Sequence, residues 1–149
     1  MATWQAFEDE AGELAAEIRK RFEAAETHVL ATLRKDGSPR VSGSEVDFRQ
    51  GQLSFGSMLG ARKARDLQRD GRCAIHAHPF DGGDAKVSGL AVEVVGAEKA
   101  AYTTGSEPGG DFHAFRLELE EAVLTAVEGD ELVITHWRPG AGVRVFRRG

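Results

Sequence analysis

The sequence lacks any apolar run of the roughly 20 residues that a bilayer-spanning helix requires. Residues 1–20 are acidic, whereas a secretory signal would be basic and then apolar, so we expect a cytoplasmic protein with no membrane contact. Only one cysteine is present, Cys73, and no disulfide can form within the chain. No neighbouring feature would lower the pKa of Cys73, so we do not expect a catalytic thiol.

The sequence is also short of positive charge, with 19 Lys and Arg against 24 Asp and Glu and a net charge of −5. This balance argues against general binding to nucleic acid or to anionic membranes, which both need a basic surface. The basic residues are nevertheless concentrated in two stretches: Arg62, Lys63, Arg65, Arg69 and Arg72, then Arg138, Arg144, Arg147 and Arg148. Local positive charge on an acidic protein favours a small anionic ligand.

The remaining composition is ordinary for a globular protein, with 41% hydrophobic and 29% charged residues. A chain of 149 residues can bury roughly 70% of the surface that it exposes when unfolded, which is enough for one core. Neither an internal repeat nor a low-complexity tract divides the sequence. We therefore expect a single domain over residues 1–149.

Two helices are predicted from the spacing of apolar residues and from helix-forming composition. Within residues 1–25, one helical face carries all the large apolar side chains: Trp4, Phe7, Leu14, Ile18 and Phe22. Residues 61–70 are rich in helix formers and follow a glycine, which predicts a second, short helix.

The first strands are marked by turn residues. Within residues 28–48, Asp36-Gly37 predicts a hairpin, because this dipeptide readily adopts the positive φ angles of a tight turn. The pair Gln50-Gly51 then introduces a third strand at residues 52–55. We expect the short helix to follow this third strand.

Further strands follow the short helix. A strand at residues 72–78 precedes a long one over residues 85–98, in which Gly89 predicts a bulge or a close backbone approach. Residues 103–111 are rich in Gly, Ser and Pro and predict a surface loop, and Glu128-Gly129-Asp130 turns a hairpin between residues 112 and 137. The pattern is mostly β, and closure into a small antiparallel barrel would remove exposed strand edges.

The segment most informative about chemistry is residues 55–64, FGSMLGARKA, where a strand runs through a glycine-flanked turn into a helix. The start of that helix offers backbone N–H groups and a positive dipole end, Ser57 offers a hydroxyl, and Arg62 can grip two phosphate oxygens. This combination predicts a phosphate-binding turn. The alternative interpretation is a solvated first helical turn, although its cations oppose the helix dipole unless an anion lies nearby.

The same segment resembles the pyridoxamine 5'-phosphate oxidase-like flavoproteins, in which Ser or Thr precedes a Leu-Gly-Ser-Arg-Lys-Ala type turn. The resemblance extends weakly over residues 25–148 and implies a split antiparallel β-barrel. It implies that FMN is bound by its phosphate at a homodimer interface, with Ser57, Arg62 and Lys63 on the phosphate. It also implies that Arg40, Val41 and Ser42 flank the isoalloxazine and that Trp137 approaches the flavin from the partner subunit.

Two departures from the family pattern bear on the reaction. Glu45 stands where pyridoxamine 5'-phosphate oxidases have a lysine, and residues 138–144 lack the Arg-x-His element that reads the substrate phosphate. We therefore do not expect vitamin B6 oxidation, but a two-electron oxidoreductase that acts on another small molecule. Two alternatives remain open: a deazaflavin coenzyme in place of FMN, or a protein that binds flavin or haem without turnover.

Aromatic and histidine side chains leave further alternatives. Trp137 is read first as a core aromatic and second as a flavin contact. His76 and His78 alternate onto one strand face and could join His113 or His136 at a metal, but no ligand motif supports a metal site. We interpret these histidines as structural or cofactor-contacting.

Overall fold

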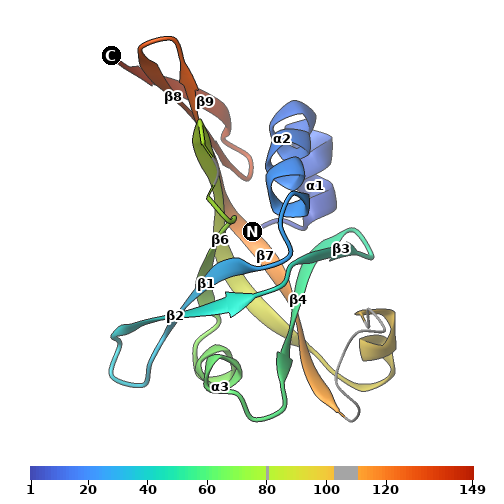
Figure 1. Ribbon diagram of the computed structural model, residues 1–149. Coiled ribbons are helices and arrows are strands. Elements are labelled where there is room, and N and C mark those ends of the chain that lie inside the picture. Colours follow the sequence, from blue (N-terminus) through green and yellow to red (C-terminus); the bar gives the residue numbers. More distant parts are fainter. Residues whose placement is uncertain (80, 103–110) are drawn as a thin grey trace.

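The computed structural model describes residues 1–79, 81–102 and 111–149 (Figure 1). Of the predicted surface loop at residues 103–111, only Asp111 therefore lies within the described residues. The elements in chain order are α1 (Trp4–Glu10), α2 (Gly12–Glu23), β1 (His28–Leu33), β2 (Pro39–Ser44), β3 (Asp47–Arg49), β4 (Gln52–Met58), α3 (Arg62–Arg69), β5 (Arg72–His76), β6 (Gly83–Val94), the 3-10 helix η1 (Gly96–Tyr102), β7 (Phe112–Glu128), β8 (Glu131–Arg138) and β9 (Gly142–Arg148).

One antiparallel sheet curls into a barrel. Its strand order is β2-β1-β5-β6-β7-β4-β3, so β2 and β3 stand at the two ends of that order. Only Glu45 and Val46 separate β2 from β3 in the sequence, which keeps the two ends of the sheet close together. A sheet constrained in this way must curl, and the result is the split antiparallel barrel that the sequence predicts (Figure 1).

The long strands β6 and β7 carry the bend of this sheet. Their pairing shifts register between Ser88 and Gly89, which is the bulge predicted at this glycine. A side chain at position 89 would also collide with the backbone carbonyl oxygen of Glu118. Both halves of the prediction for Gly89 are therefore confirmed, because the strand bends there and the neighbouring backbone leaves no room for a Cβ atom.

The N-terminal segment forms two helices, and the prediction of one continuous helix is wrong. The break lies at Ala11, whose backbone (φ −143°, ψ 56°) is not helical, and the next helix begins at Gly12. Glycine weakens a helix interior because it loses more backbone freedom than other residues do. The predicted apolar face is nevertheless correct, since every one of its residues is buried: Trp4, Phe7, Leu14, Ile18 and Phe22.

Helix α3 follows the fourth strand rather than the third. The predicted second strand divides at Glu45 and Val46, and its last residues, Asp47–Arg49, form a separate strand that pairs with β4. The reason is closure of the barrel, which requires the chain to leave β2 and join the opposite end of the sheet. Figure 1 shows α3 at the end of the sheet away from α1 and α2, and it contacts β1, β4 and β6.

The β8–β9 hairpin extends beyond the barrel and the N-terminal helices (Figure 1). Strand β9 pairs with β8 along its whole length, and all its residues except Gly142 are exposed. Trp137, next to the turn that joins β8 to β9, is fully buried against α1, with its ring 4.4 Å from that of Phe7. None of the helices in the described part of the chain has the length and apolar character that crossing a bilayer requires.

Candidate functional site

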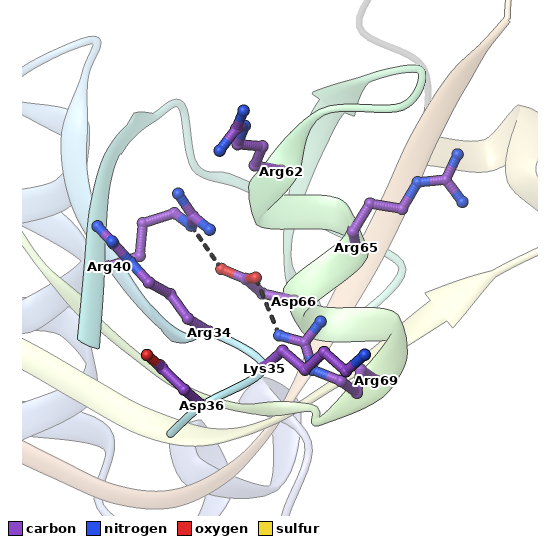
Figure 2. Close-up of a pocket in the computed structure, with 8 residues that line it drawn as sticks. All are labelled: Arg34, Lys35, Asp36, Arg40, Arg62, Arg65, Asp66 and Arg69. Atoms are coloured by element: carbon purple, nitrogen blue, oxygen red, sulfur yellow. Dashed lines mark hydrogen bonds and ion pairs between the residues drawn. The ribbon is translucent and has the colours of Figure 1, made fainter. Parts of the chain in front are cut away.

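An open cleft of about 450 Å³ lies between α3 and the turn that joins β1 to β2 (Figure 2). We call it the arginine cleft, and eight residues line it: Arg34, Lys35, Asp36, Arg40, Arg62, Arg65, Asp66 and Arg69. Six of these side chains are cationic and two are carboxylates. A neighbouring hollow, which also includes Asp70 and Arg72, continues past the carboxyl end of α3. The cleft therefore has a strong excess of positive charge on a protein of negative net charge.

Asp66 organises the floor of the arginine cleft. Its carboxylate is buried and accepts hydrogen bonds from Thr32 Oγ1 at 2.7 Å, Arg40 Nε at 2.7 Å and an Arg69 guanidinium nitrogen at 3.1 Å. Burial alone would raise the pKa of the Asp66 carboxyl, but the bonds from Arg40, Thr32 and Arg69 outweigh burial and lower it. Arg69 also donates to the carbonyl oxygen of Leu33, which ties α3 to the end of β1.

Three exposed cations of α3 line this cleft, and two of them, Arg62 and Arg65, do not contact Asp66. Neither side chain makes a hydrogen bond or an ion pair with another residue in the described ranges. Figure 2 shows Arg62 and Arg40 extending toward the same side of α3, whereas Arg65 extends away from them. No side chain caps the amino end of α3. Unpaired guanidinium groups beside an uncapped helix start are suited to an anion.

Two other residues of the predicted phosphate-binding turn lie outside the lining of the arginine cleft. Lys63 donates to the carbonyl oxygen of Gly43 on β2 at 2.9 Å, and burial lowers the pKa of its ammonium group against a smaller opposing effect of Glu45. Ser57 is buried on β4, and its hydroxyl donates to the carbonyl oxygen of Met58 at 3.2 Å. In the structure both polar groups donate to backbone carbonyl oxygens next to the start of α3.

Comparison with known proteins bears directly on this arrangement. The sequence model of a family described as pyridoxamine 5'-phosphate oxidase matches residues 14–126. The chain belongs to the pyridoxamine 5'-phosphate oxidase family. The matched region runs from α2 into β7 and includes the whole arginine cleft. Among curated proteins, no sequence matches the chain.

Solved structures share the fold of this family member at low sequence identity. PhzG from Burkholderia lata 383, in complex with tetrahydrophenazine-1-carboxylic acid, is 16% identical with a TM-score of 0.67 over 95% of each chain. A pyridoxamine 5'-phosphate oxidase-related, FMN-binding protein from Nostoc punctiforme is 13% identical, with a TM-score of 0.65 over 93% of this chain and 96% of that one. A heme-binding protein from Mycobacterium smegmatis is 19% identical, with a TM-score of 0.65 over 82% of this chain and 56% of that one.

The remaining predicted cofactor contacts of this family member are dispersed. Arg40 lines the arginine cleft, and its neighbours Val41 and Ser42 follow it along β2, with Val41 71% exposed. Trp137 is fully buried beside Phe7, and its indole nitrogen has no hydrogen-bond partner among the described residues. Within one chain, the structure brings Arg40 and Arg62 together but does not bring Trp137 to them.

Three of the four histidines weighed as metal ligands each lie beside a separate carboxylate. His76 lies 3.5 Å from an Asp84 carboxylate oxygen, and His113 and His136 contact Glu93 and Glu121. Across the described ranges, no three His, Cys, Asp or Glu side chains gather where they could hold a metal ion.

The single thiol is unsuited to nucleophilic chemistry. Cys73 is buried, and burial raises its pKa to about 12. The reactive form of a cysteine is the thiolate, which such a thiol does not populate near neutral pH.

Sequence reasoning missed the residues that give the arginine cleft its form, above all Asp66. One signal was available, because Asp66 is four residues after Arg62 and three before Arg69, positions that share one side of a helix. This spacing indicates an ion pair on α3, whereas the burial of Asp66 is shown only by the structure. The contributions of Thr32 and Arg34, which come from the β1 side, could not be read from this spacing.

Proposed function

We propose that the protein binds FMN by its phosphate in the arginine cleft and catalyses a two-electron oxidation or reduction of a small organic molecule. One observation carries the proposal: two arginines with different roles lie side by side at the cleft. Asp66 holds the Arg40 guanidinium in place, whereas Arg62 beside it has no bonding partner among the described residues and is available to an anion. Membership of the family and the FMN-binding structural neighbour support the choice of a flavin.

The residues of the cleft fit a phosphate monoester. Arg62 can donate two hydrogen bonds to its oxygens, the uncapped start of α3 adds backbone N–H groups, and Arg40 supplies positive charge from the opposite wall. Ser57 and Lys63 would complete the phosphate site. A bound flavin supplies the redox chemistry, so the chain needs mainly to bind and orient it. Val41 and Ser42 on β2 would then lie beside the ring.

We further propose that the active form is a homodimer. The predicted flavin contact Trp137 and the arginine cleft lie in different parts of one chain, so a second subunit is needed to complete the site. Strand β9 presents exposed apolar side chains next to its arginines, including Phe146 at 50% and Val145 at 54% exposure. A strand with exposed apolar side chains that pairs only with β8 among the described residues is suited to contact with another subunit.

Two other functions are compatible with the same fold. A deazaflavin coenzyme also carries a phosphate and would use the same cleft for reduction of an unsaturated compound. A protein that holds flavin or haem without turnover is favoured by the structural likeness to the Mycobacterium smegmatis heme-binding protein. The absorbance spectrum of the purified protein separates these functions, because flavin gives two visible bands, deazaflavin one shorter band, and haem a Soret band.

Titration with FMN tests the proposal. Loss of a charge-assisted hydrogen bond costs about 1.5–3 kcal/mol, so Arg62→Ala should weaken FMN binding by roughly 10- to 100-fold. Thermal stability without FMN should stay equal or rise slightly, because a cation is removed from the positive end of α3. Arg21→Ala, on α2, is the matched control and should bind like the parent. Unchanged affinities of Arg62→Ala and of the Arg62→Ala/Lys63→Ala variant for FMN and for deazaflavin would refute the site.

A further inference from the structure

A histidine outside the arginine cleft holds the turn that leads into α3. The ring of His113, on β7, accepts at Nε2 a hydrogen bond from the backbone N–H of Gly60, 3.2 Å away. Its other nitrogen, Nδ1, lies 2.8 Å from a carboxylate oxygen of Glu93 on β6. The ring is 12% exposed and therefore held away from most solvent. Glu93, His113 and Gly60 form one hydrogen-bonded chain from the sheet to the turn.

Gly60 is the residue that gives this turn its shape. The N–H of Ala61 donates to the carbonyl oxygen of Met58 at 3.1 Å, and Gly60 between them has a φ of +78°. Such a turn requires a residue that tolerates positive φ at its third position, and glycine does so without strain. The turn ends at Ala61, directly before Arg62, so the orientation of the Gly60 peptide sets where α3 begins.

The same carboxylate also reaches α3 directly. Glu93 accepts from the Gln68 side chain at 2.8 Å through its second oxygen. His113 lies opposite Ser57 in the pairing of β4 with β7, so the two side chains share one face of the sheet. The network therefore joins β6 and β7 to both ends of the segment that carries Arg62.

The hydrogen bonds assign the proton on His113. Because Nε2 accepts from the Gly60 N–H, it carries no proton, and a neutral ring then has its proton on Nδ1, where it donates to Glu93. Protonation of the ring would turn Nε2 into a second donor facing another donor. The bond to Gly60 would be lost, while the contact with Glu93 would become an ion pair.

The other charges around this ring are few in the described part of the chain. Burial alone would raise the pKa of the Glu93 carboxyl, but hydrogen bonds from Gln68 and His113 outweigh it and lower the pKa, with the positive charge of Lys99 adding to this effect. Lys99 is itself bonded to Asp111, which lies near enough to His113 to interact with it electrostatically. The charged groups that face this ring are therefore the carboxylates of Glu93 and Asp111 and the ammonium group of Lys99.

We propose that His113 and Glu93 are positioning residues of the anion site: neutral His113 holds the Gly60 turn and the start of α3 so that Arg62 meets the anion, and protonation releases this hold. The proposal deepens the proposed function, because it takes the anion in the arginine cleft to be the cofactor phosphate. It predicts that anion affinity falls when the ring of His113 gains a proton, although this ring does not touch the anion.

Binding measured against pH tests the proposal with two probes. The phosphate of FMN itself gains a proton near pH ~6, so sulfate, whose charge is fixed over this range, is titrated in parallel. For the parent, loss of one hydrogen bond on protonation should weaken binding of both probes by about threefold to tenfold between pH 8 and pH 5.5. His113→Gln can accept a hydrogen bond from the Gly60 N–H but does not titrate. It should bind both probes as well as the parent at pH 8. Its sulfate affinity should no longer depend on pH, and its FMN affinity should follow only the protonation of the FMN phosphate.

Two further variants separate positioning from general stability. His113→Phe keeps a ring but removes both hydrogen bonds, and it should bind both probes weakly at every pH. Gln68→Ala removes a bond to Glu93 without touching Gly60, and it should keep the parental pH dependence. Equal pH dependence of sulfate binding in the parent and in His113→Gln would overturn the proposal.

Nuclear magnetic resonance of the free protein gives a readout that needs no ligand. The amide proton of Gly60 should shift with pH along the titration curve of the His113 ring, and this response should vanish in His113→Gln. If the chemical shift of the Gly60 amide proton in the parent does not respond to protonation of the His113 ring, the proposal is overturned. If the amide responds and sulfate binding follows it, while FMN fails to bind at any pH, the proposed cofactor is wrong and the positioning role stands.

Discussion

The arginine cleft and the β8–β9 hairpin are both rich in arginine, but their charges are arranged differently. In the cleft, the buried carboxylate of Asp66 accepts hydrogen bonds from Arg40 on β2 and Arg69 on α3, and so holds both guanidinium groups in place. On the hairpin, Arg147 of β9 lies 3.1 Å from Glu128 at the end of β7, and both side chains are more than half exposed. Exposed pairs of this kind contribute little to stability. The contrast shows that buried ion pairs within one chain organise the cleft, whereas the ion pair of the hairpin is exposed to solvent.

The largest effect should come from removing Asp66. Asp66→Ala leaves Arg40 and Thr32 without their buried acceptor, and breaking such a pair on one side commonly costs about 3 kcal/mol or more. We expect the free energy of unfolding to fall by about this amount in urea titration and FMN binding to weaken. Asp70→Ala removes a carboxylate that pairs with the exposed Arg72 and should leave unfolding nearly unchanged. Equal stability of the two variants would show that the buried pairs do not hold the cleft.

The same residue should give stability a defined dependence on pH. The pKa of Asp66 is lower in the folded protein than its usual value near ~3.9, so its contribution is present above that value and is lost as the pH falls through the folded pKa. Asp66→Asn should therefore be less stable than the parent at pH 7, and the difference should shrink below about pH 4. Thermal unfolding from pH 7 to pH 3 measures it, and a difference that does not shrink would contradict the ionised carboxylate.

The hairpin should show the reverse behaviour, with an effect on assembly rather than on folding. Phe146→Asp puts a charge on a side chain that is half exposed in one chain, so the folded subunit should keep its stability. If a second copy covers this residue, the dimer dissociation constant should rise by roughly tenfold or more. Sedimentation at micromolar concentration measures the change. Arg144→Ala, on the same strand, is the control, and a parent that is monomeric yet binds flavin would defeat the dimer.

Those parts of the fold that depend on local signals could be predicted from the sequence. Asp36-Gly37 and Glu128-Gly129-Asp130 turn hairpins as expected, and Gly89 marks the bulge, because these features follow from what individual residues permit. Strand β9 was not predicted, since its alternation of valine with arginine does not distinguish an exposed strand from a tail. The division of β2 from β3 depends on barrel closure, which no local pattern reports.

The candidate site divides in the same way. Arg62 could be found from its place at a helix start, and Arg40 from the family resemblance. For Asp66 the only local signal is its helical spacing from Arg62 and Arg69. Its other partners, Arg40 and Thr32, lie 26 and 34 residues away in the sequence and meet it only in the folded chain. The position of His113 beside Gly60, 53 residues apart, is likewise a product of the β4–β7 pairing.

The smallest expected effect sharpens the comparison within the cleft itself. Arg65 is exposed and unpaired among the described residues like Arg62, but its side chain extends away from Arg40 (Figure 2). A cation that does not touch the phosphate acts on it only through water, where one charge contributes about 1 kcal/mol or less. Arg65→Ala should therefore weaken FMN binding by less than about fivefold, and 0.5 M salt should abolish most of that loss, because screening shortens the reach of exposed charges to a few ångströms.

Arg62→Ala should keep most of its larger loss in the same salt, since a direct hydrogen bond is screened far less. Titrations of both variants at low and high salt decide between these outcomes, and equal, salt-sensitive losses would mean that the cleft attracts the anion by its total charge rather than by the geometry of Arg62.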